Sequence, residues 1–275
     1  MSKDIKKLIH PEIKRKINKI CNFPIRSHHI LGSLGLFKSE NQKKIQRLHN
    51  IHLDKRCFII GSGPSIMKMD LSVLKNEITF GHNAFYLIKD KVGFLPTYYV
   101  VEDPLPAEDN ANEINALIDT QKIVAHDLKY CLNSEGIIYP FFDRYYNGVE
   151  SNRFPQFSFD CERRIYWGGT VVYLSIQLAA YMGCTEIYLI GVDLTYAIPD
   201  GITGNVITSD EDDQNHFHPD YFGKGKRWHD PRVNVMQKSI KYAEKILAKK
   251  NILLFNATLG GKLTHVPRVN YDSLF

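Results

Sequence analysis

The chain has 275 residues, of which 44% are hydrophobic and 24% are charged. This composition predicts a globular chain with one large core, and it excludes collagen-like, mucin-like and wholly disordered classes. The net charge of +5 is unevenly distributed, because residues 1–56 contain 14 Lys and Arg against 4 Asp and Glu. Residues 57–275 therefore carry a net charge of −5. The positive charge is a local property of the N-terminal part.

The five cysteines are scattered along the chain, at Cys21, Cys57, Cys131, Cys161 and Cys184. Their odd number and the lack of any Cys-x-x-Cys pair argue against a zinc site and a disulfide framework. We therefore expect a reducing, cytoplasmic location. We expect neither a secretory signal nor a transmembrane helix, because no apolar run approaches the lengths that these require.

Residues 1–54 form a basic N-terminal extension in this interpretation. Residues 1–20 predict an amphipathic helix with lysines opposite an aliphatic stripe, formed by Ile5, Leu8, Ile9, Ile13, Ile17 and Ile20. Such a helix can lie on an anionic membrane surface, which would make the protein peripheral to the inner face of the cell membrane. It can equally pack on the core or on a neighbouring subunit of a homo-oligomer. We expect no nucleic-acid partner, because the basic stretch lacks interleaved aromatic residues.

Apolar strands alternate with helical segments from Cys57 onward. The expected strands are 57–60, 78–80, 97–101, 186–190 and 252–255, and the expected helices are 108–118, 170–182 and 233–249. This alternation predicts an α/β fold with a Rossmann-like, mostly parallel sheet and helices on both faces. We expect residues 55–275 to form this one domain.

Ligands of such folds bind beyond the carboxyl ends of the strands. Four polar segments follow expected strands, and we expect them to line one cleft: Gly61-Ser62-Gly63-Pro64-Ser65, Asn83, Glu102-Asp103 and Gly191-Val192-Asp193. The glycine loop suits a phosphate or a ribose, although a structural tight turn is as good an interpretation of the bare pattern. Gly168, Gly169 and Thr170 precede a helix and form a second turn that suits an anion or merely caps the helix.

A polar lid is expected over residues 200–230, because long loops in compact domains are usually functional or disordered. It contains His216, His218 and His229 and the cations Lys224, Lys226 and Arg227. His216 and His218 have a spacing that can ligate a metal in a strand, but no third ligand is indicated, so we expect no metal site. His229 is placed before a helix near Pro231, where it can act as a general base or simply cap the helix.

Several segments carry a family resemblance. They are RCFIIGSGPSI (56–66), TFGHNAFYL (79–87), YYVVED (98–103), YWGGTVVYLSIQLAAYMGCTEIYLIGVDLTY (166–196) and NATLGGKLTHVPRVNYDSLF (256–275). They resemble the bacterial domain grouped with the archaeal 6-hydroxymethylpterin diphosphokinase, often found among surface-polysaccharide genes. More distantly, they are similar to the CMP-sialic acid-dependent sialyltransferases of glycosyltransferase family 42 and to motility accessory factors. The resemblance covers residues 55–275 and implies the GT-A-like variant of the Rossmann arrangement.

The sialyltransferase resemblance implies roles for individual residues. Residues Gly61–Ser65 match the loop that holds the CMP donor, with Ser62 where those enzymes usually have Asn, and Asn83 matches a nucleotide-contacting asparagine. Residues 168–170 match a turn that contacts the donor, and Tyr196 lies near the position of a tyrosine that binds the leaving phosphate. His229 best matches the catalytic base, with His216 and His218 as substitutes.

The function implied is inverting, metal-independent transfer of an acidic sugar, a nonulosonic acid or Kdo, from CMP to a glycan or glycolipid acceptor. This belongs to lipopolysaccharide or capsule synthesis. In it, backbone amides near Gly61–Ser65, Tyr196 and the lid cations Lys224, Lys226 and Arg227 would stabilise the departing phosphate.

Two alternatives stay open. An ATP-dependent diphosphokinase would need Mg²⁺, for which Glu102, Asp103 and Asp193 are available. A non-catalytic nucleotide-binding protein is the third interpretation.

Overall fold

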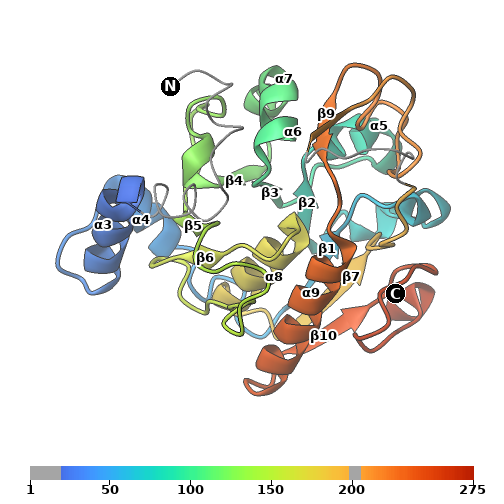
Figure 1. Ribbon diagram of the computed structural model, residues 1–275. Helices are drawn as coiled ribbons and strands as arrows, with labels where there is room; N and C mark the ends of the chain where they lie inside the picture. The colour runs from blue at the N-terminus through green and yellow to red at the C-terminus, as the bar shows by residue number, and fades with distance from the viewer. Residues whose placement is uncertain (1–19, 198–205) are drawn as a thin grey trace.

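The computed structural model describes residues 20–197 and 206–275 (Figure 1). The predicted helix over residues 1–20 and the first residues of the lid therefore lie almost wholly outside the described residues. The centre of the molecule is a six-stranded sheet in the order β10-β7-β1-β2-β3-β4. Its strands are β1 (Arg56–Ile60), β2 (Ile78–His82), β3 (Tyr98–Val101), β4 (Gln121–Val124), β7 (Glu186–Ile190) and β10 (Leu253–Asn256).

All five pairings in this sheet are parallel. Successive strands β1 to β4 extend in one direction from β1, and β7 and β10 extend in the other. The chain thus reverses direction across the sheet between β1 and β7, and such switch points hold ligands beyond the strand ends. The predicted α/β, Rossmann-like class is confirmed.

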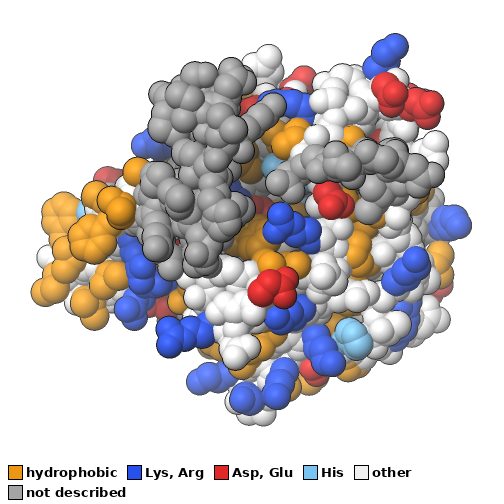
Figure 2. All heavy atoms as spheres, in the orientation of Figure 1, with side chains coloured by type: hydrophobic (Ala, Val, Ile, Leu, Met, Phe, Trp, Pro, Cys, Tyr) orange, Lys and Arg blue, Asp and Glu red, His pale blue; other side chains and the backbone are white. Residues whose placement is uncertain are grey.

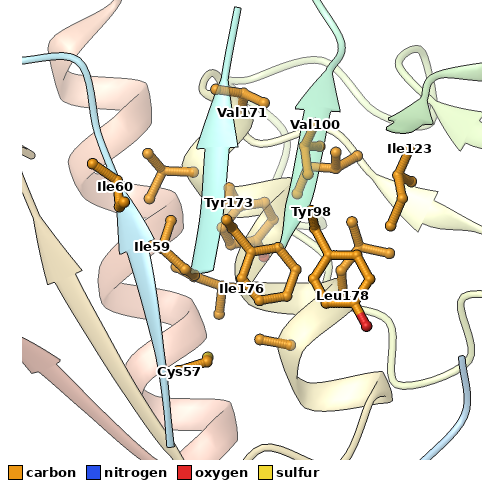
Figure 3. Close-up of a cluster of buried hydrophobic side chains, with 14 of the residues drawn as sticks. Cys57, Ile59, Ile60, Tyr98, Val100, Ile123, Val171, Tyr173, Ile176 and Leu178 are labelled. Atoms are coloured by element: carbon orange, nitrogen blue, oxygen red, sulfur yellow. The ribbon is translucent and has the colours of Figure 1, made fainter. Parts of the chain in front are cut away.

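One face of the sheet packs on α8 (Val171–Tyr181), and all eleven residues of this helix are buried. Figure 3 shows Tyr173, Ile176 and Leu178 of α8 among side chains of β1 and β3. α9 (Val233–Ala248) packs on α8 and β10. A helix that is buried on every side needs packing partners on both its inner and its outer side. Each aliphatic side chain buried in this way stabilises the fold by roughly 1.5–3 kcal/mol.

The opposite face carries a row of aromatic rings and shorter helices. Phe58 stacks on Tyr188 at 5.2 Å between ring centroids, and Tyr188 stacks on Phe255 at 5.3 Å. The C-terminal Phe275 covers Phe58 at 5.7 Å, directly after the short helix Tyr271–Leu274. The two faces are therefore covered unequally, by long helices on one side and by single helical turns on the other.

The sequence placed the long elements well and the short ones poorly. The expected helix 108–118 is two short helices, α6 (Pro104–Asp109) and α7 (Ala111–Ala116), interrupted at Asn110, whose side chain donates to the carbonyl of Pro106. The lid is not one loop, because β8 (Val206–Thr208) and β9 (Arg227–His229) pair as an antiparallel ribbon. His229 thus lies in a strand rather than next to a helix start. The remaining elements are α3 (Phe23–Ser33), α4 (Glu40–Gln46), α5 (Lys89–Val92), β5 (Phe142–Asp143), β6 (Ile165–Tyr166) and the single-turn helices Pro64–Lys68, Ser72–Leu74, Phe85–Ile88 and His126–Leu128.

Part of the expected N-terminal extension belongs to the core. Ile45 of α4 is 1% exposed and Leu48 is 7% exposed, and both join the main hydrophobic cluster. The boundary expected at residue 54 stays a prediction, but residues 40–48 are packed against the domain. Within the described part of the chain, no helix combines the length and apolarity needed to cross a bilayer.

His82, at the end of β2, links the sheet to α8. Its Nδ1 lies 3.0 Å from the carbonyl oxygen of Ile60, and its Nε2 lies 2.8 Å from the Ser175 hydroxyl. Burial lowers the pKa of His82 to about 4. The ring is therefore neutral in the folded protein at neutral pH, with Nδ1–H donating to Ile60 and Nε2 accepting from Ser175.

The neutral state of His82 predicts that the free energy of unfolding decreases at acid pH. The pKa of His82 falls from its ordinary 6.5 to about 4 on folding, so the stabilisation is present above pH 6.5 and is lost as the pH falls towards 4. The shift corresponds to about 3 kcal/mol. We expect urea titrations at decreasing pH to show a smaller loss of unfolding free energy for His82→Gln than for the wild type. His265→Gln, at an exposed position, is the control, and equal pH dependence in both variants would contradict the prediction.

Candidate functional site

Two glycine turns meet at the switch point of the sheet. The amide of Gly61 donates to the carbonyl of Ile190 at 2.7 Å, and the amide of Gly63 donates to that of Gly191 at 2.9 Å. The Ser65 amide donates to Asp193 Oδ2 at 3.1 Å. A Cβ on Gly63 would lie 1.8 Å from Asp193 Oδ2, so the contact requires glycine. The structure therefore brings the predicted loops 61–65 and 191–193 together.

The contacts between the two turns contradict the expectation that several backbone amides of Gly61–Ser65 bind the donor phosphate. The amides of Gly61, Gly63 and Ser65 are already bonded to residues 190–193, and Pro64 has no N–H. Among the described residues, only the Ser62 amide of this loop lacks a partner. The loop therefore cannot offer a cradle of several amides to a phosphate. It offers the Ser62 amide and the hydroxyls of Ser62 and Ser65.

Asn83 follows β2 and lies beside the glycine loop through a shared partner, Tyr221. The Asn83 side-chain amide donates to the Tyr221 hydroxyl at 3.2 Å, and that hydroxyl lies 2.8 Å from Ser62 Oγ. Asn83 has φ of 46°, and the Tyr99 hydroxyl donates to its carbonyl, which fixes this left-handed conformation. Sequence reasoning predicted Asn83 but missed Tyr221.

Tyr221 is 1% exposed and fills the space between Ser62 and Asn83. Its ring stacks on His216 at 4.2 Å, and the amide of Phe217 donates to the carbonyl of Ser62 at 3.0 Å. The His216 Nδ1 lies 2.6 Å from Asp213. The lid tip, residues 213–222, is thus docked on the glycine loop, with His216 enclosed inside it. The one signal for this in the sequence was the density of aromatic residues in the lid.

Among the residues that the structure describes, two buried polar atoms of this region have no hydrogen-bond partner, Ser65 Oγ and Asn83 Oδ1. Buried hydroxyls and amides are almost always paired, because an unpaired one costs about 1–3 kcal/mol. Asn83 contacts Tyr221 through its side-chain amide, and Ser65 contacts Asp193 through its backbone amide. The Ser65 hydroxyl and the Asn83 side-chain oxygen therefore keep hydrogen-bonding capacity beyond the carboxyl ends of β1 and β2.

Glu102 and Asp103 directly follow β3, and their side chains lie in different environments. Glu102 is buried, and burial raises the pKa of its carboxyl to about 7 although Arg144 lies beside it. Arg144 Nη1 donates to Glu102 at 2.6 Å, and Arg144 Nε donates to Asp127 at 2.6 Å. Glu102 is therefore part of a buried charge network rather than a ligand-facing group. Arg144 was not predicted, because no local pattern marks it.

Asp103 faces the opposite way and holds His229. One oxygen of Asp103 accepts from the Leu105 amide at 3.0 Å and caps α6, and its carboxylate lies 3.2 Å from His229 Nδ1. The His229 side chain is 45% exposed. An imidazole whose Nδ1–H donates to a carboxylate presents its Nε2 to solvent as a proton acceptor. The predicted residues Asp103 and His229, 126 positions apart, are thus brought together as a pair.

The other predicted lid residues lie elsewhere. Arg227 pairs with Asp109 and Glu108, and Lys226 Nζ lies 2.8 Å from Asn110 Oδ1, so both cations hold β9 against α6 and α7. Lys224 is exposed, and His218 accepts from the Asp220 amide at 3.1 Å. The expectation that Lys226 and Arg227 supply charge to a donor is wrong for this arrangement, because acidic and amide groups of α6 and its C-terminus occupy them.

Thr170 caps α8, and its hydroxyl accepts from the Val172 amide at 3.3 Å. Gly169 has φ of 88° and approaches Val235 of α9, and Gly168 lies against the ring of Tyr173. The contacts of residues 168–170 are therefore those of a helix cap, which is one of the two roles expected for this turn. Because α8 also carries Ser175, the partner of His82, its N-terminus lies at the same sheet edge as Asn83.

Tyr196 is half-buried beside His216, with 6.1 Å between the ring centroids. Burial, together with Asp193 and Asp213, raises the pKa of Tyr196 to about 12. Its hydroxyl stays protonated at neutral pH and can donate a hydrogen bond.

The three carboxylates proposed as Mg²⁺ ligands do not converge. Glu102 is engaged by Arg144, Asp103 by His229 and Asp193 by the Ser65 amide. In residues 20–197 and 206–275, no group of three or more His, Cys, Asp or Glu side chains is placed to hold a metal ion. These carboxylates therefore do not form a set of ligands that could hold Mg²⁺ between them.

Comparison with known proteins gives one family match. A family model described as "6-hydroxymethylpterin diphosphokinase MptE-like" matches residues 34–199, so the match begins and ends earlier than the resemblance found in the sequence. No curated protein matches the chain.

Among solved structures, the MAf glycosyltransferase from Magnetospirillum magneticum AMB-1 is similar, with a TM-score of 0.51 and 17% identity over 86% of this chain. The chain spans 39% of that protein. The sialyltransferase CstII from Campylobacter jejuni gives a TM-score of 0.43 and 15% identity, covering 80% of this chain and 88% of CstII. At these identities, the MAf likeness shows a shared fold.

We expect the Tyr221 hydroxyl to hold the lid tip closed. Tyr221→Phe keeps the ring stacked on His216 but removes the bonds to Ser62 and Asn83, each worth about 1 kcal/mol. Hydrogen exchange of residues 213–222 should accelerate by about fivefold or more. Tyr271→Phe, which removes a similar hydroxyl bond to the carbonyl of Asp70, is the matched control and should leave the lid tip unchanged. Unchanged exchange in Tyr221→Phe would show that the Tyr221 hydroxyl does not hold the tip closed.

Proposed function

The chain belongs to the family described as 6-hydroxymethylpterin diphosphokinase MptE-like, and from the geometry of its site we propose that it is an inverting glycosyltransferase. The proposed donor is a CMP-activated acidic sugar, a nonulosonic acid or Kdo. The proposed acceptor is a hydroxyl of a glycan or glycolipid in surface-polysaccharide synthesis. The fold shared with the MAf glycosyltransferase is compatible with this activity.

The pair of His229 and Asp103 carries the proposal. A general base for sugar transfer must be exposed enough to reach the acceptor hydroxyl and must be held in one tautomer. His229 meets both conditions, because Asp103 fixes Nδ1 and leaves Nε2 towards solvent. His216 is also held by a carboxylate, Asp213, but it fails the first condition because it is enclosed beneath the Tyr221 ring and cannot reach an acceptor.

The donor nucleotide is proposed to bind between the glycine loop and Asn83. Within residues 20–197 and 206–275, Asn83 Oδ1, Ser65 Oγ and the Ser62 amide have no hydrogen-bond partner. These groups match the donors and acceptors of a ribose and a pyrimidine edge. Tyr221 occupies part of this space, so the lid tip has to move aside when the nucleotide enters.

In the proposed reaction, His229 Nε2 accepts the proton of the acceptor hydroxyl as its oxygen bonds to the anomeric carbon. The bond from that carbon to the phosphate oxygen breaks on the opposite face, and CMP leaves with the electron pair. Tyr196, protonated because of its raised pKa, donates a hydrogen bond to the departing phosphate. Asp103 stabilises the imidazolium that forms on His229.

The family description favours a second candidate, an ATP-dependent diphosphokinase. That reaction needs Mg²⁺ to bridge the phosphates. The engagement of Glu102 by Arg144 and of Asp193 by Ser65 weakens this candidate, because it leaves no converging carboxylates. Thermal-shift measurements with CMP, CDP, UDP and ATP, each with and without Mg²⁺, separate the two. Stabilisation by CMP without metal supports glycosyl transfer, and stabilisation by Mg·ATP alone would refute it.

We expect His229→Ala to lower kcat of the transferase by about a hundredfold or more while CMP still stabilises the protein, because the base is lost but the nucleotide site is intact. His218→Ala is the comparison, since His218 is also a lid histidine, but its Nδ1 accepts from the Asp220 amide, which leaves the proton of the neutral ring on Nε2. This variant should keep near wild-type kcat. Full activity of His229→Ala, or a greater loss in His218→Ala, would show that the base has been assigned to the wrong residue.

A further inference from the structure

Large apolar side chains are exposed on and after α3. Phe23 is 66% exposed, Leu34 67% and Leu36 72%. Figure 2 shows the corresponding apolar cluster at the left edge of the molecule, over α3, with Lys and Arg side chains beside it. We call this the α3 surface and define it as Ile20, Phe23, Leu31, Leu34, Leu36 and Phe37.

Helical geometry explains why these residues share one side. At 100° per residue, Phe23 and Leu31 lie within one stripe of α3, and Ile20 comes just before the helix. The opposite stripe contains His29 and Gly32, which are buried against the domain. The α3 surface is therefore the side of the helix that the core leaves uncovered.

The α3 surface is held in a fixed arrangement. The chain reverses after α3 through bonds from the Gly35 amide to Gly32 and from the Leu36 amide to Leu31 at 3.1 Å. The Phe37 ring packs edge-on against His28 at 5.1 Å. These contacts keep Leu34, Leu36 and Phe37 presented outward as a continuation of the helix stripe.

The buried side of α3 is anchored by contacts with Glu162 and with α4. His29 Nδ1 lies 3.1 Å from the carbonyl oxygen of Glu162, and Lys38 pairs with the Glu162 carboxylate at 2.9 Å. Gln42 of α4 donates to the carbonyl of His28 at 3.0 Å, and Gly32 lets it approach closely. The surface is thus a built part of the fold.

The charge around this surface identifies its partner. Residues 20–47 contain five Lys and Arg and one Glu. Lys38 pairs with Glu162 and Lys43 with Glu40, and the other three cations, Arg26, Lys44 and Arg47, have no ion pair with another described residue. A second copy of the chain would bring equal positive charges together, whereas an anionic bilayer complements them and takes up the apolar side chains. We propose that the α3 surface docks the protein on an anionic lipid bilayer.

This proposal differs from the expectation for residues 1–20, with which it shares only Ile20, because it rests on α3 and the turn after it, which contacts with the domain hold in place. It does not depend on the proposed glycosyl transfer, because bilayer binding is measured without substrate. Docking would, however, present the domain to a lipid-linked acceptor.

The test is flotation of the full chain with vesicles of phosphatidylcholine and phosphatidylglycerol, and with phosphatidylcholine alone. We expect the wild type to float with the anionic vesicles only. Phe23→Ser, Leu34→Ser and Leu36→Ser combined should weaken binding by about tenfold or more, because three membrane-facing side chains are lost. The three positions are exposed, so folding should be preserved, which circular dichroism checks.

Two further variants make the result specific. Val73→Ser, Ile118→Ser and Leu259→Ser combined remove exposed apolar side chains from other parts of the chain and should leave binding unchanged. Lys44→Glu with Arg47→Glu should weaken binding to anionic vesicles. Unchanged binding of the α3-surface variant would place membrane affinity in residues 1–19 and overturn the proposal. So would absence of binding by the wild type, or a dimer in light scattering that the α3-surface variant abolishes.

Discussion

The site depends on the close approach of two backbone turns at the ends of β1 and β7. The chain can bring Gly61 and Gly63 against Gly191 only because neither side of the contact has a side chain in the way, since a Cβ on Gly61 would lie 2.4 Å from the Gly191 carbonyl oxygen. The contact uses three backbone amides of the loop as hydrogen-bond donors to residues 190–193, so only the remaining polar groups are available to a ligand. It leaves hydroxyls and an asparagine, which suits recognition of a nucleoside better than a cluster of phosphates.

The adjacent carboxylates of Glu102 and Asp103 show how one strand end serves two purposes. Side chains alternate along an extended segment, so one of the two turns inward and the other outward. Glu102 meets Arg144 in the interior, where removal of either partner would leave an uncompensated buried charge. Asp103 turns outward, where it caps α6 and orients His229. The inward pair fixes the strand end, and the outward one carries the chemistry that we propose.

The sequence was sufficient for features that depend on local pattern and insufficient for those that depend on long-range contact. Apolar runs ending in glycine or acid predicted four of the strands and the loops that follow them, and a short apolar run before Asn256 predicted a fifth. Nothing local indicated β4, whose residues Gln121 and Lys122 are polar and whose Lys122 is satisfied by three carbonyls of the preceding α7 region. The sequence also suggested that Lys226 and Arg227 face the donor. Their real partners lie more than a hundred residues away, on and next to α6, where no spacing rule could find them.

These partners divide the lid into two parts with different attachments. The β9 arm is fixed to α6 by the ion pairs of Arg227 and by His229 on Asp103. The tip is fixed to the glycine loop by the Tyr221 hydroxyl and by one backbone bond at Phe217, and the stacking of His216 on Tyr221 holds the tip together internally. A nucleotide that competes for Ser62 and Asn83 replaces the Tyr221 bonds with its own, whereas nothing at the glycine loop competes for Arg227. In the proposed reaction, the tip would therefore open while the ion pairs of Arg227 keep β9 in place, and His229 would keep its contact with Asp103 as substrate and product exchange.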